Sequence, residues 1–336
     1  MAVVNRFGSR GFGGAARLAA LLLLPPVLSF PQNSPAPELA PSSRQAASAS
    51  PAGTLRLRAK PLMIDVDLVE IPVTVTDIRN RPVLDLQETD FSLLEDGEQQ
   101  QIRYFSRDEA PLTVGVLLDL SRSMRKKIGM AREAVSEFFK NSNPDDDFFV
   151  ITFDDKPRLL IDTTQSIGTI ESKLVTAVPD GHTALLDAIY MGVKKARSAR
   201  HKRRALLIIS DGADNNSRYR ADEIRALVQE ADVEIYAIDI YDSLFALPED
   251  RAGRRLLTHI TEATGGRTCV VDNISRLPEA ARAISTELRS RYLLGYRPSR
   301  PLRDGRYRKI NVRVQASTSA NPLQVYFRRG YFSPSE

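Results

Sequence analysis

The chain has 336 residues, 42% of them hydrophobic and 26% charged, which is ordinary for a soluble protein and allows about two folded domains. Lysine and arginine number 47 against 42 acidic residues, a net charge of +5 on a surface of mixed sign, which argues against the clustered basic surface of a nucleic-acid-binding protein. The single cysteine, Cys269, excludes an intrachain disulfide and a metal site built from several thiolates.

The first segment has the features of an export signal. Arg6, Arg10 and Arg17 accompany an apolar stretch over residues 18–28, which is shorter than the ~20 residues that span a membrane. We predict that residues 1–29 are a signal peptide cleaved after Ser29, with an uncleaved N-terminal membrane anchor as the alternative. No cysteine follows closely, which excludes a lipid-modified N-terminus. The protein is therefore expected in the periplasm or outside the cell.

Residues 30–59 are rich in proline, alanine and serine and contain few large apolar side chains. Such a segment cannot bury enough surface to offset the entropy lost on ordering. We therefore predict a disordered linker between the signal and the folded part of the chain.

Residues 60–110 carry the alternating pattern of β-strands, first over 64–73 and 72–76. Two further β-prone runs, 91–94 and 102–105, flank Glu95-Asp96-Gly97-Glu98, and an Asp-Gly pair in that position is typical of a hairpin. The region is predicted to contain four or five strands and no helix.

From residue 111 to residue 290, near-continuous apolar strands alternate with helical segments. This alternation is typical of a parallel sheet covered by helices on both faces, and it predicts an α/β, Rossmann-like domain. The expected strands are 113–120, 148–153, 158–161, 205–210, 233–240 and 268–271, and the expected helices are 124–140, 167–175, 185–199, 222–231, 255–263 and 277–289.

Residues 291–333 return to β-strand patterns, over 292–296, 307–314 and 323–327, with Asp304-Gly305 as a predicted hairpin turn. A unit of this size is too small to fold comfortably alone. We therefore expect it to pair with residues 60–110 in one all-β, sandwich-like domain, into which the α/β domain is inserted.

Three short segments carry the chemistry of the α/β region: Asp119-Leu120-Ser121-Arg122-Ser123, Gly181-His182-Thr183 and Ser210-Asp211-Gly212. Each lies after or beside a predicted strand, at the edge where open α/β sheets bind ligands. Two carboxylates and three hydroxyls are hard oxygen ligands, which suit Mg²⁺, with Mn²⁺ or Ca²⁺ as alternatives. The predicted metal ligands are Asp119, Ser121, Ser123, Thr183 and Asp211.

Each segment also has an ordinary structural explanation. Ser121 and Ser123 are good caps for a helix that begins near Met124, and Thr183 is a good cap for the helix that follows it. Asp211 could belong to a simple turn. The joint placement of all three segments at strand ends favours the metal site.

The order Asp-x-Ser-x-Ser, then Thr in a Gly-x-Thr-Ala loop, then Ser-Asp-Gly resembles the metal-ion-dependent adhesion site of von Willebrand factor type A domains. The resemblance implies that Ser121, Ser123 and Thr183 bind the cation through hydroxyls, and that Asp119 and Asp211 bind it directly or through water. It also implies that an acidic residue of a partner completes the coordination. Arg122 departs from the family, where glycine is frequent, and a cation there could weaken metal binding or attract a carboxylate.

The flanking regions resemble a family of exported bacterial proteins with such domains, best known from Acidobacteria. The resemblance rests on Leu94-Glu95-Asp96-Gly97, Phe105-Ser106-Arg107-Asp108, Tyr292-Leu293-Leu294-Gly295-Tyr296 and Arg329-Gly330-Tyr331. It covers residues 60–333 and implies an architecture more than a role.

A binding module is the function that these features favour: an exported, adhesion-like protein that captures an Asp or Glu of a protein or peptide partner through the cation. A metal-dependent hydrolase is a weaker alternative, because there is no Gly-x-Ser-x-Gly nucleophile elbow and His182 is better placed as a rim residue than as a base. We expect no enzymatic activity. A third possibility is a cell-envelope scaffold in which the metal only stabilises loops.

Overall fold

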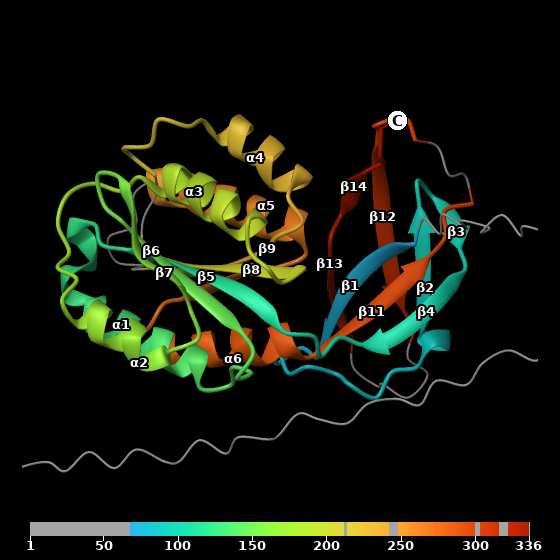
Figure 1. Cartoon of the computed structure of the whole chain (residues 1–336), viewed down its shortest axis with the longest axis horizontal. Helices are drawn as coiled ribbons and strands as arrows, with labels where there is room; N and C mark the ends of the chain where they lie inside the picture. The colour runs from blue at the N-terminus through green and yellow to red at the C-terminus, as the bar shows by residue number, and fades with distance from the viewer. Residues whose placement is uncertain (1–67, 212–213, 242–247, 300–302, 316–321, 336) are drawn as a thin grey trace, which may run out of the picture. The chain divides into compact units, whose positions relative to one another are not determined.

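A computed structural model describes residues 68–211, 214–241, 248–299, 303–315 and 322–335 (Figure 1). The predicted signal peptide (1–29) and linker (30–59) lie outside the described residues, as does the start of the first predicted strand. None of the helices in the described ranges is both long and apolar enough to cross a membrane.

The α/β region contains one six-stranded sheet in the order β10-β9-β8-β5-β6-β7. Every neighbouring pair is parallel except β6 and β7, which form an antiparallel hairpin at one edge. The sequence prediction of a mostly parallel sheet is therefore confirmed. The strands are β5 (Leu112–Asp119), β6 (Asp147–Phe153), β7 (Pro157–Thr164), β8 (Arg203–Ser210), β9 (Glu234–Ile240) and β10 (Thr268–Val271).

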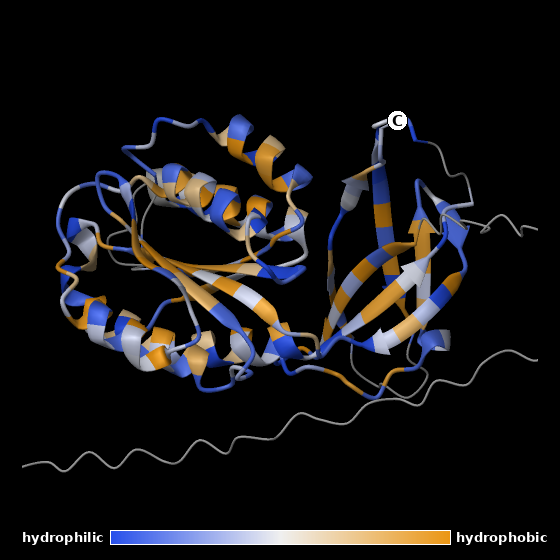
Figure 2. Ribbon diagram, in the orientation of Figure 1, coloured by the Kyte–Doolittle hydropathy of each residue, from blue (hydrophilic) through white to orange (hydrophobic). Residues whose placement is uncertain are grey.

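Helices cover both faces of this sheet, as Figure 1 shows, and Figure 2 shows the apolar strands between them. The two faces have separate apolar cores because side chains alternate along each strand: Val116 and Leu118 of β5 lie in one core and Leu117 in the other. One face carries α1 (Ile128–Phe139), α2 (Ile167–Val175) and α6 (Leu277–Arg289), and the other α3 (Leu185–Arg197), α4 (Ala221–Glu230) and α5 (Pro248–Thr264).

The remaining strands form two four-stranded sheets in the orders β13-β1-β11-β4 and β14-β12-β2-β3. Both sheets mix N-terminal with C-terminal strands and share one apolar core, so the predicted pairing of the two flanks around the α/β region is confirmed. The strands are β1 (Val69–Thr76), β2 (Phe91–Glu95), β3 (Glu98–Gln100), β4 (Ile102–Arg107), β11 (Arg291–Tyr296), β12 (Tyr307–Val314), β13 (Gln324–Phe327) and β14 (Gly330–Phe332).

Two Asp-Gly turns were predicted to join neighbouring strands in hairpins, and in both cases the predicted strand pair is wrong. Asp96 and Gly97 have φ of 47° and 87° and form a tight turn, but the turn joins β2 to the short strand β3, while β4 pairs with β11 in the other sheet. Asp304-Gly305 does not join β11 to β12, since these strands lie in different sheets. The Asp-Gly signal thus marks a turn and leaves the pairing open. A short 3-10 helix, Glu88–Asp90, also interrupts the region predicted to lack helices.

Candidate metal centre

Asp119 and Asp211 lie at the carboxyl edge of the six-stranded sheet, at the ends of its two central strands. Asp119 is the last residue of β5, and Asp211 directly follows Ser210, the last residue of β8. The two strands are parallel neighbours with Leu118 opposite Ile209, so both carboxylates emerge from the same edge. This edge is the usual ligand-binding edge of an open α/β sheet.

Hydrogen bonds join four of the five predicted ligands. Asp119 accepts from the Ser121 backbone N–H through Oδ1 at 2.7 Å and from the Ser210 hydroxyl through Oδ2 at 2.6 Å. The hydroxyls of Ser121 and Ser123 lie 3.0 Å apart, and the Ser123 hydroxyl donates to Asp211 Oδ1 at 2.7 Å. The oxygen atoms of these four residues therefore gather at one point of the sheet edge.

Thr183, the fifth predicted ligand, is buried in a loop that is tied to the 119–123 segment and to Asn215. The Arg122 N–H donates to the Gly181 carbonyl at 3.1 Å, and the Thr183 N–H donates to Asn215 Oδ1 at 2.8 Å. These bonds use backbone groups of the loop and hold it beside the 119–123 segment, but they do not join the Thr183 hydroxyl to the other four predicted ligands. Gly181 has a φ of +84°, and a Cβ there would lie 2.9 Å from Asp155 Oδ1, so the loop requires glycine.

The helix caps do not use the predicted ligand hydroxyls. Ser121 is the N-cap of a 3-10 helix, Arg122–Lys126, but its side chain makes no capping bond. The N-cap of α3 is Ala184 and not Thr183. The predicted helix 124–140 is also wrong at its start, because this 3-10 turn intervenes and α1 begins only at Ile128.

The two carboxylates are fully buried: Asp119 is 0% exposed, and so is the Asp211 side chain. Burial first, and then the negative charge of Asp211, raise the pKa of the Asp119 carboxyl to about 6. A divalent cation between the two aspartates would relieve both effects. Ser123, in contrast, is exposed, so the group of oxygen atoms is open to solvent on that side.

The donor types fit a hard cation better than a soft one. Among the described residues no group of three or more His, Cys, Asp or Glu side chains could hold a metal, so a site here depends on hydroxyl ligands. Hydroxyl and carboxylate oxygens are ligands for Mg²⁺, Mn²⁺ and Ca²⁺. The arrangement of Asp119, Ser121, Ser123 and Asp211 therefore fits the metal that the sequence motif implies.

Lys127 also belongs to this site, although sequence reasoning missed it. Its ammonium group forms an ion pair with Asp211 Oδ2, and its side chain is 24% exposed. A lysine just after a Ser-rich turn has the pattern of a solvated helix start, so no local signal distinguishes it from Lys126. Ser210, which donates to Asp119, was named in the motif without a role, and Asn215, which holds the Thr183 loop, was not predicted.

Arg122 does not contact the predicted ligands through its side chain. Its guanidinium pairs with Asp180 at 3.3 Å, where Arg125 also pairs at 2.8 Å, and all three side chains are exposed. The positive charge of Arg122 is thus partly offset on the rim. His182 is likewise on the rim, with its ring Nδ1 2.8 Å from Asp155 Oδ1.

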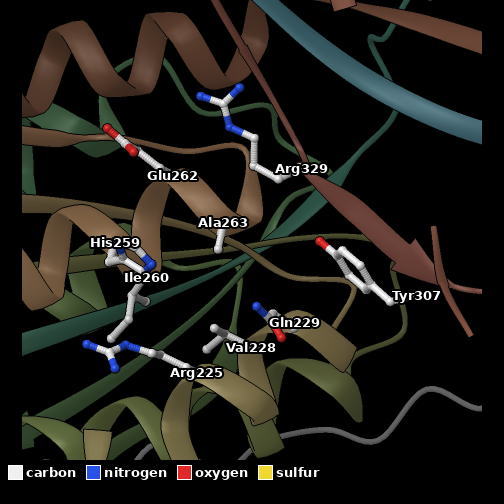
Figure 3. Close-up of a pocket in the computed structure, with 9 residues that line it drawn as sticks. All are labelled: Arg225, Val228, Gln229, His259, Ile260, Glu262, Ala263, Tyr307 and Arg329. Atoms are coloured by element: carbon white, nitrogen blue, oxygen red, sulfur yellow. The ribbon is translucent and has the colours of Figure 1, made fainter. Parts of the chain in front are cut away.

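A separate hollow of about 280 Å³ lies away from this site (Figure 3). It is lined by α4, α5, Tyr307 and Arg329, and none of the predicted metal ligands borders it.

The sheet order, the covering helices and the candidate site at the carboxyl edge define an α/β domain of the open-sheet class. Residues 114–213 match the family model described as the von Willebrand factor type A domain, a span that contains all five predicted ligands. The α/β region therefore has the fold of a von Willebrand factor type A domain and is joined to a β-sandwich.

Several solved structures are similar to the chain. A von Willebrand factor type A protein from Catenulispora acidiphila is 11% identical and has a TM-score of 0.47, over 80% of this chain and 73% of that one. BatB from Bacteroides thetaiotaomicron is 20% identical with a TM-score of 0.44, over 53% and 97%. Proximal thread matrix protein 1 from the mussel byssus, described with a zinc-occupied MIDAS motif, is 15% identical with a TM-score of 0.46, over 58% and 49%. A comparison with curated proteins gives no match.

Proposed function

We propose that this protein is an exported binding module that holds a divalent cation, Mg²⁺ in the first instance, and uses it to capture an acidic residue of a protein or peptide partner. The proposed ligands are Asp119, Ser121, Ser123, Thr183 and Asp211. Export rests on the N-terminal sequence pattern. Membership of the exported bacterial family that the flanks resemble stays a prediction.

One observation carries the proposal. Two fully buried carboxylates from adjacent strand ends, Asp119 and Asp211, are linked by the hydroxyls of Ser121 and Ser123, and Ser123 reaches the surface. Burying like charges together is costly unless cations offset them, and Lys127 supplies one positive charge against two carboxylates. The exposed side of the group leaves room for a ligand from outside.

The cation would supply an electrophilic centre that a carboxylate can bind. Because hydroxyl ligands are neutral, two aspartates at most balance the charge of the ion, and an incoming Asp or Glu would add a favourable negative charge. The residues of this chain would orient the ion and exclude water from its inner side, where Asp119 and Ser121 are buried.

Hydrolysis is less well supported than binding. The hydroxyls of Ser121 and Ser123 bond to each other and to Asp211, and the His182 ring bonds to Asp155. In the described part of the chain no histidine is directed at either serine. A Ser-His arrangement for nucleophilic catalysis is therefore not formed here.

Asp119→Ala is expected to abolish binding of Mg²⁺ and Mn²⁺, because it removes the innermost charged ligand. The measurement is calorimetric titration of the purified chain with each ion. Asp162→Ala is the matched control. It removes an exposed aspartate of the edge strand β7, which pairs with Lys195 of α3, and it should bind metal like the wild type. Asp119→Asn, which keeps an acceptor for the Ser121 N–H, separates the loss of charge from loss of local structure.

The same variants test capture of a partner from a cell-envelope extract, with and without EDTA. Retention that disappears both in EDTA and in Asp119→Ala supports the proposal. Equal retention in EDTA would refute it. A variant that melts at lower temperature yet keeps its partner would favour the structural scaffold with a stabilising metal.

A further inference from the structure

Lys127 occupies a fixed position beside the metal centre. It is the last residue before α1, and its N–H donates to the Met124 carbonyl at 2.9 Å, which closes the 3-10 turn that follows Ser121. From there its side chain reaches Asp211 and forms an ion pair with it. Lys126, one residue earlier, is exposed. The backbone therefore directs one of two consecutive lysines at the carboxylates.

All four oxygens of the two carboxylates have a donor within the chain. Asp119 receives the Ser121 N–H and the Ser210 hydroxyl, and Asp211 receives the Ser123 hydroxyl and the Lys127 ammonium. Among the described residues, Lys127 is the one cation that forms an ion pair with either carboxylate. It thus supplies positive charge to two buried aspartates.

A metal ion affects these donors differently. A serine hydroxyl carries lone pairs, so Ser123 can rotate its proton away and become a ligand. An ammonium group has three donors and no lone pair, so Lys127 cannot bind a cation and must either leave Asp211 Oδ2 or stay beside a like charge. The flexible lysine stem, one quarter exposed, allows the first of these.

We propose that Lys127 is an internal counter-ion that competes with the divalent cation for Asp211 and so sets the metal affinity of the site. This inference rests on the proposed function. It implies that the site binds metal weakly by itself, because Lys127 offsets part of the negative charge of Asp211. The carboxylate of a partner would replace that negative charge and so strengthen metal binding.

Replacing Lys127 with methionine tests this competition, because methionine fills similar space without a charge. In calorimetric titrations with Mg²⁺ and with Mn²⁺, Lys127→Met should bind each ion at least about tenfold more tightly than the wild type. Lys126→Met, which removes the same charge from the neighbouring exposed position, should stay within about twofold of the wild type. In EDTA, Lys127→Met should melt at a lower temperature than Lys126→Met, and added Mg²⁺ should raise its melting temperature by more.

Lys127→Gln keeps a hydrogen-bond donor for Asp211 and loses only the charge, so it reports on the competition even where Lys127→Met folds poorly. Metal affinities of the Lys127 variants that equal the wild type, or fall below it, would overturn the inference while leaving the proposed metal site intact. If the wild type and every variant bind neither ion, the metal site itself is wrong, and the inference falls with it.

Discussion

Asp108→Asn is expected to lower the free energy of unfolding by about 3–5 kcal/mol, the usual cost of breaking a buried ion pair by removing one partner. Asp108 lies between β4 and β5 and is 8% exposed. Its carboxylate pairs with Arg203 at 3.0 Å and with Arg291 at 2.7 Å, and both arginine side chains are buried. Without the charge of Asp108, two buried guanidinium groups would share the remaining carboxylate of Glu234, which pairs with Arg291.

Burial already disfavours the charged form of Arg203 in the wild type. Burial first, and then the positive charge of Arg291, lower the pKa of Arg203 to about 10, against the opposing effect of Asp108. Arg203 also donates to the carbonyls of Asp108 and Leu288, at 3.2 Å and 2.8 Å, so it links the two segments where the chain enters and leaves the α/β domain. Loss of the Asp108 charge should therefore destabilise both of these connecting segments together.

Denaturant titration in EDTA measures the effect, with Glu109→Gln as the control because Glu109 is the exposed neighbour. The double variant Asp108→Asn/Arg203→Met should recover part of the loss, since it also removes one of the two unbalanced cations. The ion-pair network would not be the source of stability if Asp108→Asn were as stable as Glu109→Gln. The same would follow if the double variant lost as much free energy of unfolding as Asp108→Asn and Arg203→Met lose separately when added together.

The parts of the fold that were predictable from the sequence are those that local side-chain patterns determine. The helices Ile167–Val175 and Leu277–Arg289 begin and end at the predicted residues, because each has apolar side chains at helical spacing next to a clear end signal. The strand Tyr307–Val314 agrees in the same way, with polar and apolar residues in alternation. Such patterns identify an element and the face that it buries.

Strand partners were less predictable because they depend on contacts far apart in the sequence. β4 has the composition of a hairpin partner for β2, but it crosses to β11, some 190 residues later, where Leu294 pairs with Phe105. Phe105 stacks on Tyr292 with ring centroids 5.5 Å apart, a contact that only the folded chain reveals. The β-strand character of residues 102–105 was evident from the sequence, but the strand with which they pair was not.

The same division holds at the candidate metal centre. Asp119, Ser121, Ser123, Thr183 and Asp211 could be proposed together because a short motif fixes their order. Lys127 could not, because nothing in its local sequence separates it from Lys126, and only the turn at Met124 directs its side chain inward. Motifs thus predicted the oxygen ligands but not the cation that balances them.

Deleting residues 291–336 is expected to have the largest effect on the β-sandwich, because it removes one or more neighbours from three of its four N-terminal strands. β1 and β4 would lose β11, their shared neighbour, β1 would also lose β13, and β2 would lose β12. The deletion also removes six buried apolar or aromatic side chains from the core: Tyr292, Leu294, Tyr296, Ile310, Val312 and Phe327. At about 1.5–3 kcal/mol each, their combined contribution is as large as the whole stability of a typical domain.

The truncated chain should therefore aggregate or form a mixture of sizes on gel filtration, whereas the full chain elutes as one species. The α/β domain has its own two cores, so part of the helical circular dichroism signal should survive the deletion. Co-expression with a separate 291–336 segment is the control, since β11 and β12 supplied in trans can pair with β1, β4 and β2 and restore a single soluble species. A truncated chain that elutes and melts like the full protein, or a stable proteolytic fragment of residues 60–110 alone, would show that the two flanks do not depend on each other.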